Sequence, residues 1–215
     1  MENALEKHSQ PEIELKFPLD EPGKMRKHLL ELGFVSRGKL FEFNLVLDTP
    51  GRDLDSQGRL LRLRRAKGVK LTYKEPLEEG GLGKRFKAKK ESELELSSLD
   101  TMRHILHRLG FTAERVYEKY REHLTREEGV SAEIDQLPRM GYFLELEAPP
   151  EKMEEIIESL GLKVSKGLRE NYFDLYTAYC RKMGCEAGDM RFSDQENVGN
   201  SGSKPRRARL PLEQA

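Results

Sequence analysis

The chain has 215 residues and carries 38 basic and 38 acidic side chains, so its formal net charge is zero. This length is typical of one large domain or two small ones. The balanced charge argues against a dedicated nucleic-acid-binding protein and against a protein of anionic membrane surfaces. Charged residues nevertheless make up 35% of the chain, compared with about 25% in an average soluble domain. The main question is therefore where these charges lie.

The two ends of the chain differ in composition from its middle. Residues 1–10 are polar, contain no apolar signal-peptide core and are expected to be flexible. Residues 184–215 are rich in Gly, Asn, Ser, Pro and charge, which predicts a disordered tail after a folded domain over 11–183. No apolar run of about 20 residues predicts a membrane span. Cys180 and Cys185 do not suggest a disulfide framework, so a cytoplasmic protein is expected.

Alternation of polar and apolar residues dominates between these ends and predicts β-strands. Eight strands are expected, at about 12–17, 40–48, 59–66, 69–75, 85–95, 115–124, 130–136 and 142–148. Apolar residues at helical spacing predict helices over 22–33, 99–109, 151–160 and 168–183. This order predicts an α+β fold with an antiparallel sheet, and eight meandering strands can close into a β-barrel with the helices packed outside.

Most of the expected strands have one apolar face and one ionisable face, because residues of one parity share a face. In the first strand, Glu12, Glu14 and Lys16 lie opposite apolar neighbours. The same alternation places the following residues together on the polar faces of later strands: Arg62 and Arg64; Lys70 and Lys74; Lys89, Glu91 and Glu93; Lys119 and Arg121; Glu133 and Asp135; Glu145 and Glu147.

Two interpretations of these faces are open. An ordinary sheet with one solvated side also carries charges. However, pairs of like charge two residues apart, about 7 Å on one face, repel each other, and a surface selected only for solubility mixes signs. In a closed barrel the charged faces point inward, and such a lumen is costly unless it is hydrated and holds a charged ligand. Carboxylates suit Mg²⁺ or Mn²⁺, and guanidinium and ammonium groups suit phosphates, so a metal–polyphosphate complex matches both.

The segment Glu12-Ile13-Glu14-Leu15-Lys16 resembles the ExExK signature of the CYTH domain. This superfamily, also called triphosphate tunnel metalloenzymes, includes class IV adenylate cyclases, thiamine triphosphatases and inorganic tripolyphosphatases. The resemblance extends over about residues 11–180 and continues in order through Arg62-Leu63-Arg64, Lys74 in LTYKEP, Glu91 and Glu93, Lys119-Tyr120-Arg121, Asp135, and Glu145-Leu146-Glu147. It implies an eight-stranded antiparallel barrel that binds a triphosphate and a divalent metal inside.

The resemblance also implies roles for individual residues. The carboxylates expected to hold Mg²⁺ or Mn²⁺ are Glu12, Glu14, Asp135, Glu145 and Glu147. The cations expected to bind phosphate oxygens are Lys16, Arg62, Arg64, Lys74, Lys119 and Arg121. The candidate catalytic residues are Glu12, Glu14, Lys16 and Glu147, and the additional tunnel candidates are Lys89, Glu91, Glu93, Glu133 and Lys166.

Several functions fit this constellation. Hydrolysis of tripolyphosphate or a nucleoside triphosphate is favoured, because phosphoryl transfer depends mainly on positioning and on neutralising charge. A class IV adenylate cyclase and a non-catalytic binder of polyphosphate or nucleotide are the alternatives, and no sequence motif reads adenine. The expected partner is a triphosphate-containing small molecule, not a membrane or a nucleic acid, and the sequence leaves a homodimer open. Tyr172 is expected in the core stripe of the last helix or, alternatively, at one end of the tunnel.

Overall fold

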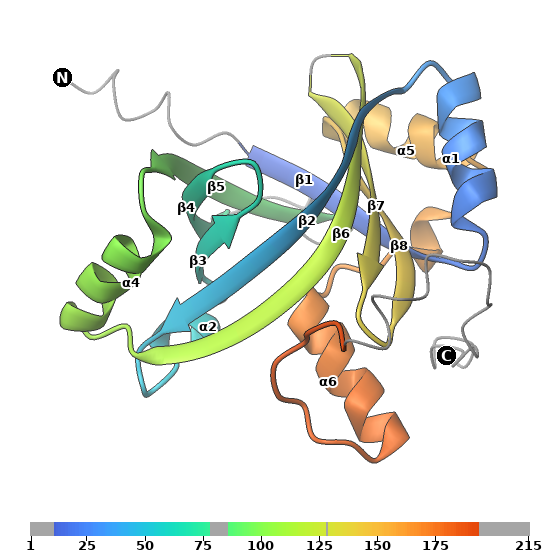
Figure 1. Cartoon of the computed structure of the whole chain (residues 1–215). Helices are drawn as coiled ribbons and strands as arrows, with labels where there is room; N and C mark the ends of the chain where they lie inside the picture. Colours follow the sequence, from blue (N-terminus) through green and yellow to red (C-terminus); the bar gives the residue numbers. More distant parts are fainter. Residues whose placement is uncertain (1–10, 78–85, 128, 194–215) are drawn as a thin grey trace, which may run out of the picture.

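The computed structural model describes residues 11–77, 86–127 and 129–193 (Figure 1). The expected flexible N-terminus, residues 1–10, lies outside the described residues. So do residues 194–215 of the expected tail. Within the described ranges, no helix is both long and apolar enough to cross a membrane.

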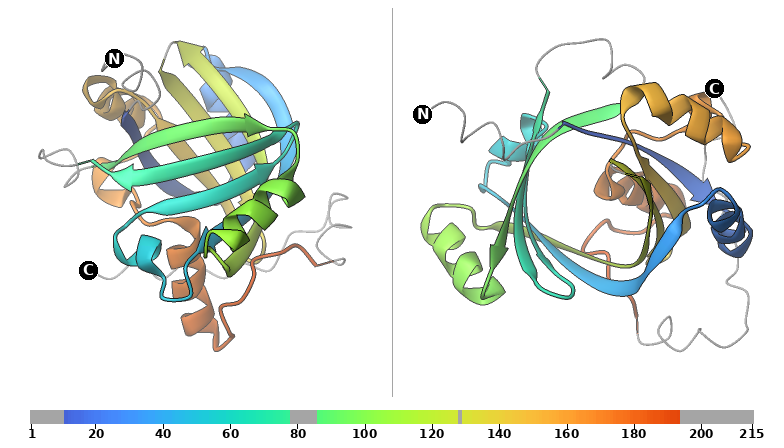
Figure 2. Two further views of the ribbon diagram at one scale, coloured as in Figure 1. Left: turned by 90° about the vertical axis from the view of Figure 1, so that its left-hand side faces the viewer. Right: turned by 90° about the horizontal axis from the view of Figure 1, so that it is seen from above.

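Eight antiparallel strands form one sheet that closes in a ring, in the order β1-β5-β4-β3-β2-β6-β7-β8 (Figure 2). Their bounds are β1 (Pro11–Leu19), β2 (Val35–Asp48), β3 (Leu60–Arg65), β4 (Val69–Pro76), β5 (Lys87–Leu96), β6 (Ala113–Glu127), β7 (Val130–Leu137) and β8 (Gly141–Glu147). The expected α+β barrel is confirmed. The first part of β2 was not expected, because its polar residues around a bulge between Ser36 and Lys39 interrupt the alternation.

Helices pack around the ring. They are α1 (Pro22–Glu31), α2 (Asp53–Ser56), α4 (Leu99–Arg108), α5 (Pro150–Ser159) and α6 (Tyr172–Met183), with a 3₁₀ turn at Val164–Lys166. Two of them, α2 and α6, contribute residues to the lining of its cavity. The last helix begins at Tyr172 instead of residue 168, because Asn171 and Asp174 form a reciprocal capping box at its start. The backbone of Leu168 instead pairs with that of Lys16 on β1.

The apolar face of the sheet points outward and is buried by the helices. Leu15 of β1 and Leu146 of β8 pack in one cluster with Met153 of α5 and Leu29 of α1. A second cluster lies outside the ring under α4, against β2 and β3. Because side chains alternate along a strand, burial of these residues outside the ring turns the charged faces toward its interior. The cluster beneath α6 instead contains Tyr117 of β6 and Phe143 of β8, which share the inward-facing parity, so α6 packs at one end of the ring.

The segment after α6 is part of the fold, which corrects the expectation of a disordered tail from residue 184. We call residues 185–193 the C-terminal strap. Met190 is fully buried, its N–H donates to Val116 O at 2.9 Å, and its carbonyl accepts from Glu118 N–H at 2.8 Å. The pairing of β7 with β6 begins only at Tyr120, so the strap fills the open edge of β6 before that point. Composition did not reveal this role because the interaction is made mainly by backbone groups.

Candidate functional site

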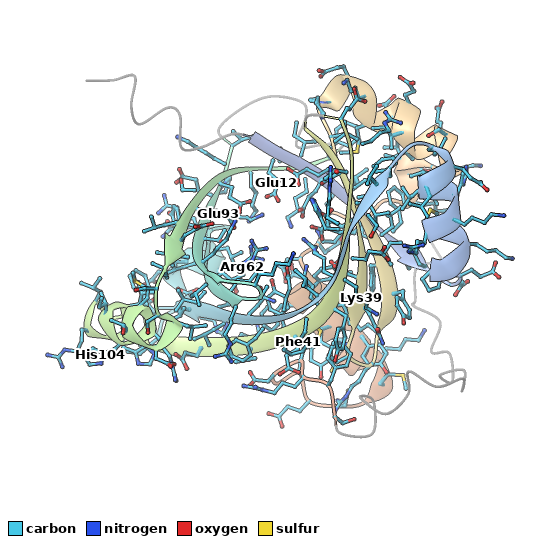
Figure 3. All side chains as sticks on the ribbon, turned by 45° about the horizontal axis from the view of Figure 1, so that its top comes forward. Glu12, Lys39, Phe41, Arg62, Glu93 and His104 are labelled. Carbon is cyan, nitrogen blue, oxygen red and sulfur yellow. The ribbon has the colours of Figure 1, made fainter. Side chains whose placement is uncertain are left out.

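The ring of strands encloses a cavity of about 840 Å³. All eight strands contribute ionisable side chains to its lining: Glu12 from β1, Glu42 from β2, Arg62 from β3, Lys74 from β4, Glu91 from β5, Lys119 from β6, Glu133 from β7 and Glu145 from β8. In Figure 3 the labelled Glu12, Glu93 and Arg62 point into the ring, whereas Lys39, Phe41 and His104 lie outside it. The ionic faces of the strands therefore form the wall of a tunnel.

A group of buried cations occupies the side of the tunnel formed by β3 and β6. Arg62 donates from its guanidinium to the hydroxyl of Tyr117 at 2.9 Å. Lys119 lies 3.0 Å from Asp135, and Arg121 forms two hydrogen bonds of 2.7 and 2.6 Å with the same carboxylate. Burial opposes the charged form of Arg121, but Asp135 and Glu145 keep its pKa well above the usual value. Arg121 thus stays ionised inside the protein.

A second ionic group surrounds Lys16 on β1. Lys16 forms ion pairs with Glu14 and with Glu145, the latter at 3.3 Å, and Lys87 lies 2.5 Å from Glu14. Burial alone would raise the pKa of Glu14, but Lys16 and Lys87 lower it to about 2. Gly167 allows this part of the chain to approach closely, because a Cβ there would lie 2.9 Å from a methyl carbon of Leu15.

The remaining cations lie on β3 and β4. Lys74 contacts Glu12 and lies 2.7 Å from Glu91. Arg64 lies 3.0 Å from Glu93, which also accepts hydrogen bonds from Lys70 at 2.8 Å and from Thr72 at 2.9 Å. All six predicted phosphate-binding side chains therefore line one cavity.

Three carboxylates of the tunnel are incompletely neutralised. Burial raises the pKa of Glu147 to about 8, and the neighbouring Glu12 and Glu133 add to the shift. Burial also raises the pKa of Glu12 to about 7, although Lys74 opposes the shift. Oε2 of Glu133 is buried without a hydrogen-bond partner among the described residues. This wall of the tunnel has an excess of carboxyl groups over nearby cations, and two of these groups retain their protons up to near-neutral pH.

This excess fits a divalent cation, because hard carboxylate oxygens are the ligands that Mg²⁺ and Mn²⁺ prefer. No three His, Cys, Asp or Glu side chains of the described ranges are placed so that they could hold a metal ion by themselves. Magnesium is commonly bound by one or two carboxylates together with the phosphates of a substrate. The donor set therefore fits an ion that is shared between the protein and a phosphate ligand.

The structure places three predicted residues differently from the sequence analysis. Lys166 is exposed in the 3₁₀ turn and does not line the cavity, which corrects its assignment to the tunnel; this turn packs against the outside of β1. Lys89 does not line the cavity either, and its ammonium donates to Gly58 O at 2.5 Å. Asp135, expected to help hold the metal, is fully buried and accepts from two tunnel cations and from the hydroxyl of Tyr172 at 2.8 Å.

Three further residues line the tunnel that were not among the predicted site residues: Glu42, Lys87 and Tyr117. Glu42 is buried and lies 3.6 Å from Lys119 and 3.8 Å from Arg64, while Lys87 and Tyr117 bind Glu14 and Arg62 as described above. The alternation along β2 could have revealed Glu42, because this residue lies on the same face of the expected strand as Val46 and Asp48. Tyr172 lies both in the α6 core and in the cavity lining, which supports both of its expected positions.

The comparisons with known proteins agree with this geometry. Residues 10–171 match the family model of the CYTH domain. A Methanocaldococcus jannaschii protein named "Putative adenylate cyclase MJ0240" is 30% identical over 175 residues, which cover 76% of this chain and 97% of that protein.

Two solved structures illustrate the similarity of the fold. The PH1819 protein from Pyrococcus horikoshii OT3 is 28% identical with a TM-score of 0.63, and the match covers 76% of this chain and 97% of that chain. The HpAC1 protein from Hippeastrum, described with a dominant triphosphatase activity, is 16% identical with a TM-score of 0.50 over 82% of this chain and 96% of that chain, and this likeness concerns the fold alone. The closed ring, its ionic tunnel and the family match lead to one conclusion: the chain belongs to the CYTH domain family of triphosphate tunnel proteins.

Proposed function

We propose that this protein is a metal-dependent hydrolase that binds a triphosphate compound in its tunnel and removes the terminal phosphate. The observation that carries the proposal is the convergence of six cations from four strands on one cavity, beside carboxylates that are not fully neutralised. Phosphate oxygens match the cations, and a divalent metal matches the carboxylates.

The cations explain how a triphosphate would be held. Lys16, Arg62 and Lys119 are each less than 10% exposed, and desolvated charges of this kind stabilise a protein only when they are well paired. In the proposed complex the guanidinium groups donate paired hydrogen bonds to phosphate oxygens, and the ammonium groups supply point charges. These cations would also neutralise the charge that develops on the phosphate during transfer, so the reaction would need no covalent nucleophile.

The carboxylates supply the second half of the proposal. Glu12 and Glu147, together with phosphate oxygens, would hold Mg²⁺ or Mn²⁺, and a bound metal neutralises phosphate charge and lowers the pKa of a bound water. Without a metal, burial raises the pKa of Glu147 to about 8, so metal binding near neutral pH would release a proton from this carboxyl group. Asp135 would hold Lys119 and Arg121 in position for the phosphates.

Adenylate cyclase activity is the second candidate, and the name of the M. jannaschii relative favours it. Both reactions use the same phosphate-binding cations. They differ in the phosphorus atom that faces the nucleophile: water attacks the terminal phosphorus in the hydrolase, whereas the 3′-hydroxyl of ATP attacks the α-phosphorus in the cyclase and releases pyrophosphate.

The deciding experiment incubates the purified protein with ATP and with tripolyphosphate, each in the presence of Mg²⁺ or Mn²⁺. The proposal expects orthophosphate; cyclic AMP would identify the cyclase, and binding without turnover would identify a non-catalytic binder. The variant Glu147→Gln is expected to lose turnover by about 100-fold, because the metal would lose a carboxylate ligand. Glu151→Gln, at an exposed position of α5, serves as the matched control. Full turnover in a Glu12→Gln, Glu147→Gln double variant would remove the metal assignment.

A further inference from the structure

One end of the cavity differs chemically from its ionic middle. This end lies between α2 and α6, both of which are at the lower end of the ring in Figure 1. Its lining combines Leu54 of α2, Leu60 at the start of β3 and Phe173 in the first turn of α6 with charged side chains of the same segments, among them Arg52, Asp55 and Asp174. Apolar side chains do not favour the binding of a bare polyphosphate, because its charged oxygens would lose water there without gaining hydrogen-bond partners.

An arginine stacked on an aromatic ring marks the same end. The guanidinium carbon of Arg115 lies 4.5 Å from the centroid of the Phe173 ring. Tyr117 packs edge-on against the same phenylalanine, with 5.4 Å between the ring centroids and an interplanar angle of 83°, and this contact fixes the orientation of Phe173. Arg115 itself lines the cavity and is only half-buried, so the ring supports the guanidinium while leaving it accessible to a ligand.

Arg115 also lacks the ion pairs that neutralise the cations in the middle of the tunnel. None of the salt bridges among the described residues involves Arg115, nor the nearby cavity-lining Arg52 and Arg59. By contrast, Arg64 and Arg121 each contact two carboxylates. An arginine without a carboxylate partner keeps its planar face and its donors available for a ligand.

We infer that this end of the tunnel, which we call the base site (Leu54, Leu60, Arg115 and Phe173), binds the aromatic base of a nucleoside triphosphate. The base stacks on the free face of the Arg115 guanidinium, which is a favourable partner for aromatic rings. The inference rests on the proposed binding of a triphosphate and adds the class of substrate. A cavity of about 840 Å³ is within the usual range for an organic small-molecule ligand and leaves room beyond the phosphates.

Equilibrium binding tests this inference without requiring turnover. The probes are adenylyl imidodiphosphate and the imido analogue of tripolyphosphate, each measured by calorimetry with Mg²⁺. In Arg115→Ala, the dissociation constant of the adenine nucleotide is expected to increase about tenfold, because a stacking partner is lost. The constant for the inorganic analogue is expected to change by less than twofold. Arg115→Lys keeps the charge but lacks the planar face, so its loss is also expected to be selective for the nucleotide.

The chain offers a matched control. Arg65 also stacks on a phenylalanine, with its guanidinium carbon 5.3 Å from the Phe43 ring centroid, but it is exposed and does not line the cavity. Arg65→Ala is therefore expected to bind both probes like the parent protein. The base site is supported if the affinity for the nucleotide falls selectively in both Arg115 variants and does not fall in Arg65→Ala.

Three outcomes would overturn the inference. Equal weakening of both probes would make Arg115 a general charge for polyanions, and unchanged affinities would mean that no ligand reaches it. A larger loss for an inorganic polyphosphate longer than three units would assign this end to a continuing anionic chain. Hydrolysis of tripolyphosphate combined with any of these results would leave the proposed function standing, whereas base-selective binding without orthophosphate release would contradict only the hydrolase.

Discussion

Glu12 and Glu147 keep their protons at pH values where most carboxylates have lost them. Burial raises their pKa values to about 7 and about 8, and neighbouring carboxylates contribute. Between the unfolded-state value of about 4.5 and these folded-state values, the folded protein binds more protons than the unfolded chain. Stability is therefore greatest at the acidic side of this range and decreases as the pH rises toward 8.

We predict that this decrease depends on metal. In the presence of a chelator, the melting temperature of the protein should fall between pH 5 and pH 8, because these two residues lose their stabilising protons. Mg²⁺ together with a triphosphate should reduce the fall, because a cation favours the deprotonated carboxylates. Thermal unfolding across this pH range checks the prediction, and Glu147→Gln should flatten the curve measured with chelator. A curve that is equally steep in the variant would assign the effect to other groups.

Glu42 behaves in the opposite way. Burial alone would raise its pKa, but Lys119 and the neighbouring arginines lower it to about 2. A carboxylate with a lowered folded-state pKa stabilises the protein above its unfolded-state value, and this stabilisation is lost as the pH falls from about 4.5 toward 2. Such residues make the ionic tunnel sensitive to acid.

We therefore predict that Glu42→Gln reduces the melting temperature at pH 7 and makes the remaining stability less dependent on pH below 4.5. The loss at pH 7 is expected to be about 3 kcal/mol, because buried cations would lack a partner. Glu151→Gln, at an exposed position, is the control and should follow the parent protein at every pH. If the melting temperature of Glu42→Gln falls below pH 4.5 as steeply as that of the parent protein, Glu42 is not among the groups whose protonation causes the fall.

At the scale of elements, period-two alternation predicted all eight strands because one side of the sheet is buried under helices along most of its length. It failed where a segment without alternation pairs with a strand edge through backbone groups and buries a single large side chain. The C-terminal strap has no alternation and reads as a tail, yet Met190 is fully buried and completes the edge of β6. The open edge that this strap fills exists only after β6, β7 and β2 have assembled.

The strap gives a direct test at this scale. Met190→Ala is expected to cost about 2 kcal/mol or more, because a buried side chain is replaced by a cavity. For a chain of this size each kcal/mol lowers the melting temperature by about 2–4 °C. Arg191→Ala is the matched control, since Arg191 lies in the same strap but its side chain is half exposed, with long or exposed ion pairs and a contact of 5.7 Å to the Phe43 ring centroid. Equal melting temperatures for the two variants would contradict a structural role for the strap.

At the scale of the whole molecule, the tunnel concentrates buried charges of both signs within one closed ring. A ligand that binds only the folded protein stabilises it by RT ln(1 + [L]/Kd), which is about 2.7 kcal/mol at a hundredfold excess over Kd. A triphosphate with Mg²⁺ is therefore expected to raise the melting temperature by several degrees.

Paired variants can assign this shift to the tunnel. Arg62→Met removes a buried tunnel cation, whereas Arg65→Met removes an exposed arginine on the same strand. The ligand-induced increase should be strongly reduced in Arg62→Met and kept in Arg65→Met, as measured by thermal unfolding with and without the ligand. An equal increase in both variants would place the ligand outside the tunnel.

The sequence by itself determined that each strand has one apolar and one ionic face, because parity along a strand is a local property of the chain. From it followed the fold class and most of the cavity lining, including Arg62, Lys119 and Glu147. Only the tertiary structure decided which cation meets which carboxylate. The β6–β7 pairing places Asp135 opposite Arg121, whereas the pairing of β1 with β8 that closes the ring brings Lys16 to Glu145. Glu12 and Glu147 remain incompletely neutralised, and the strength of each charge depends on burial and on neighbours from distant parts of the chain.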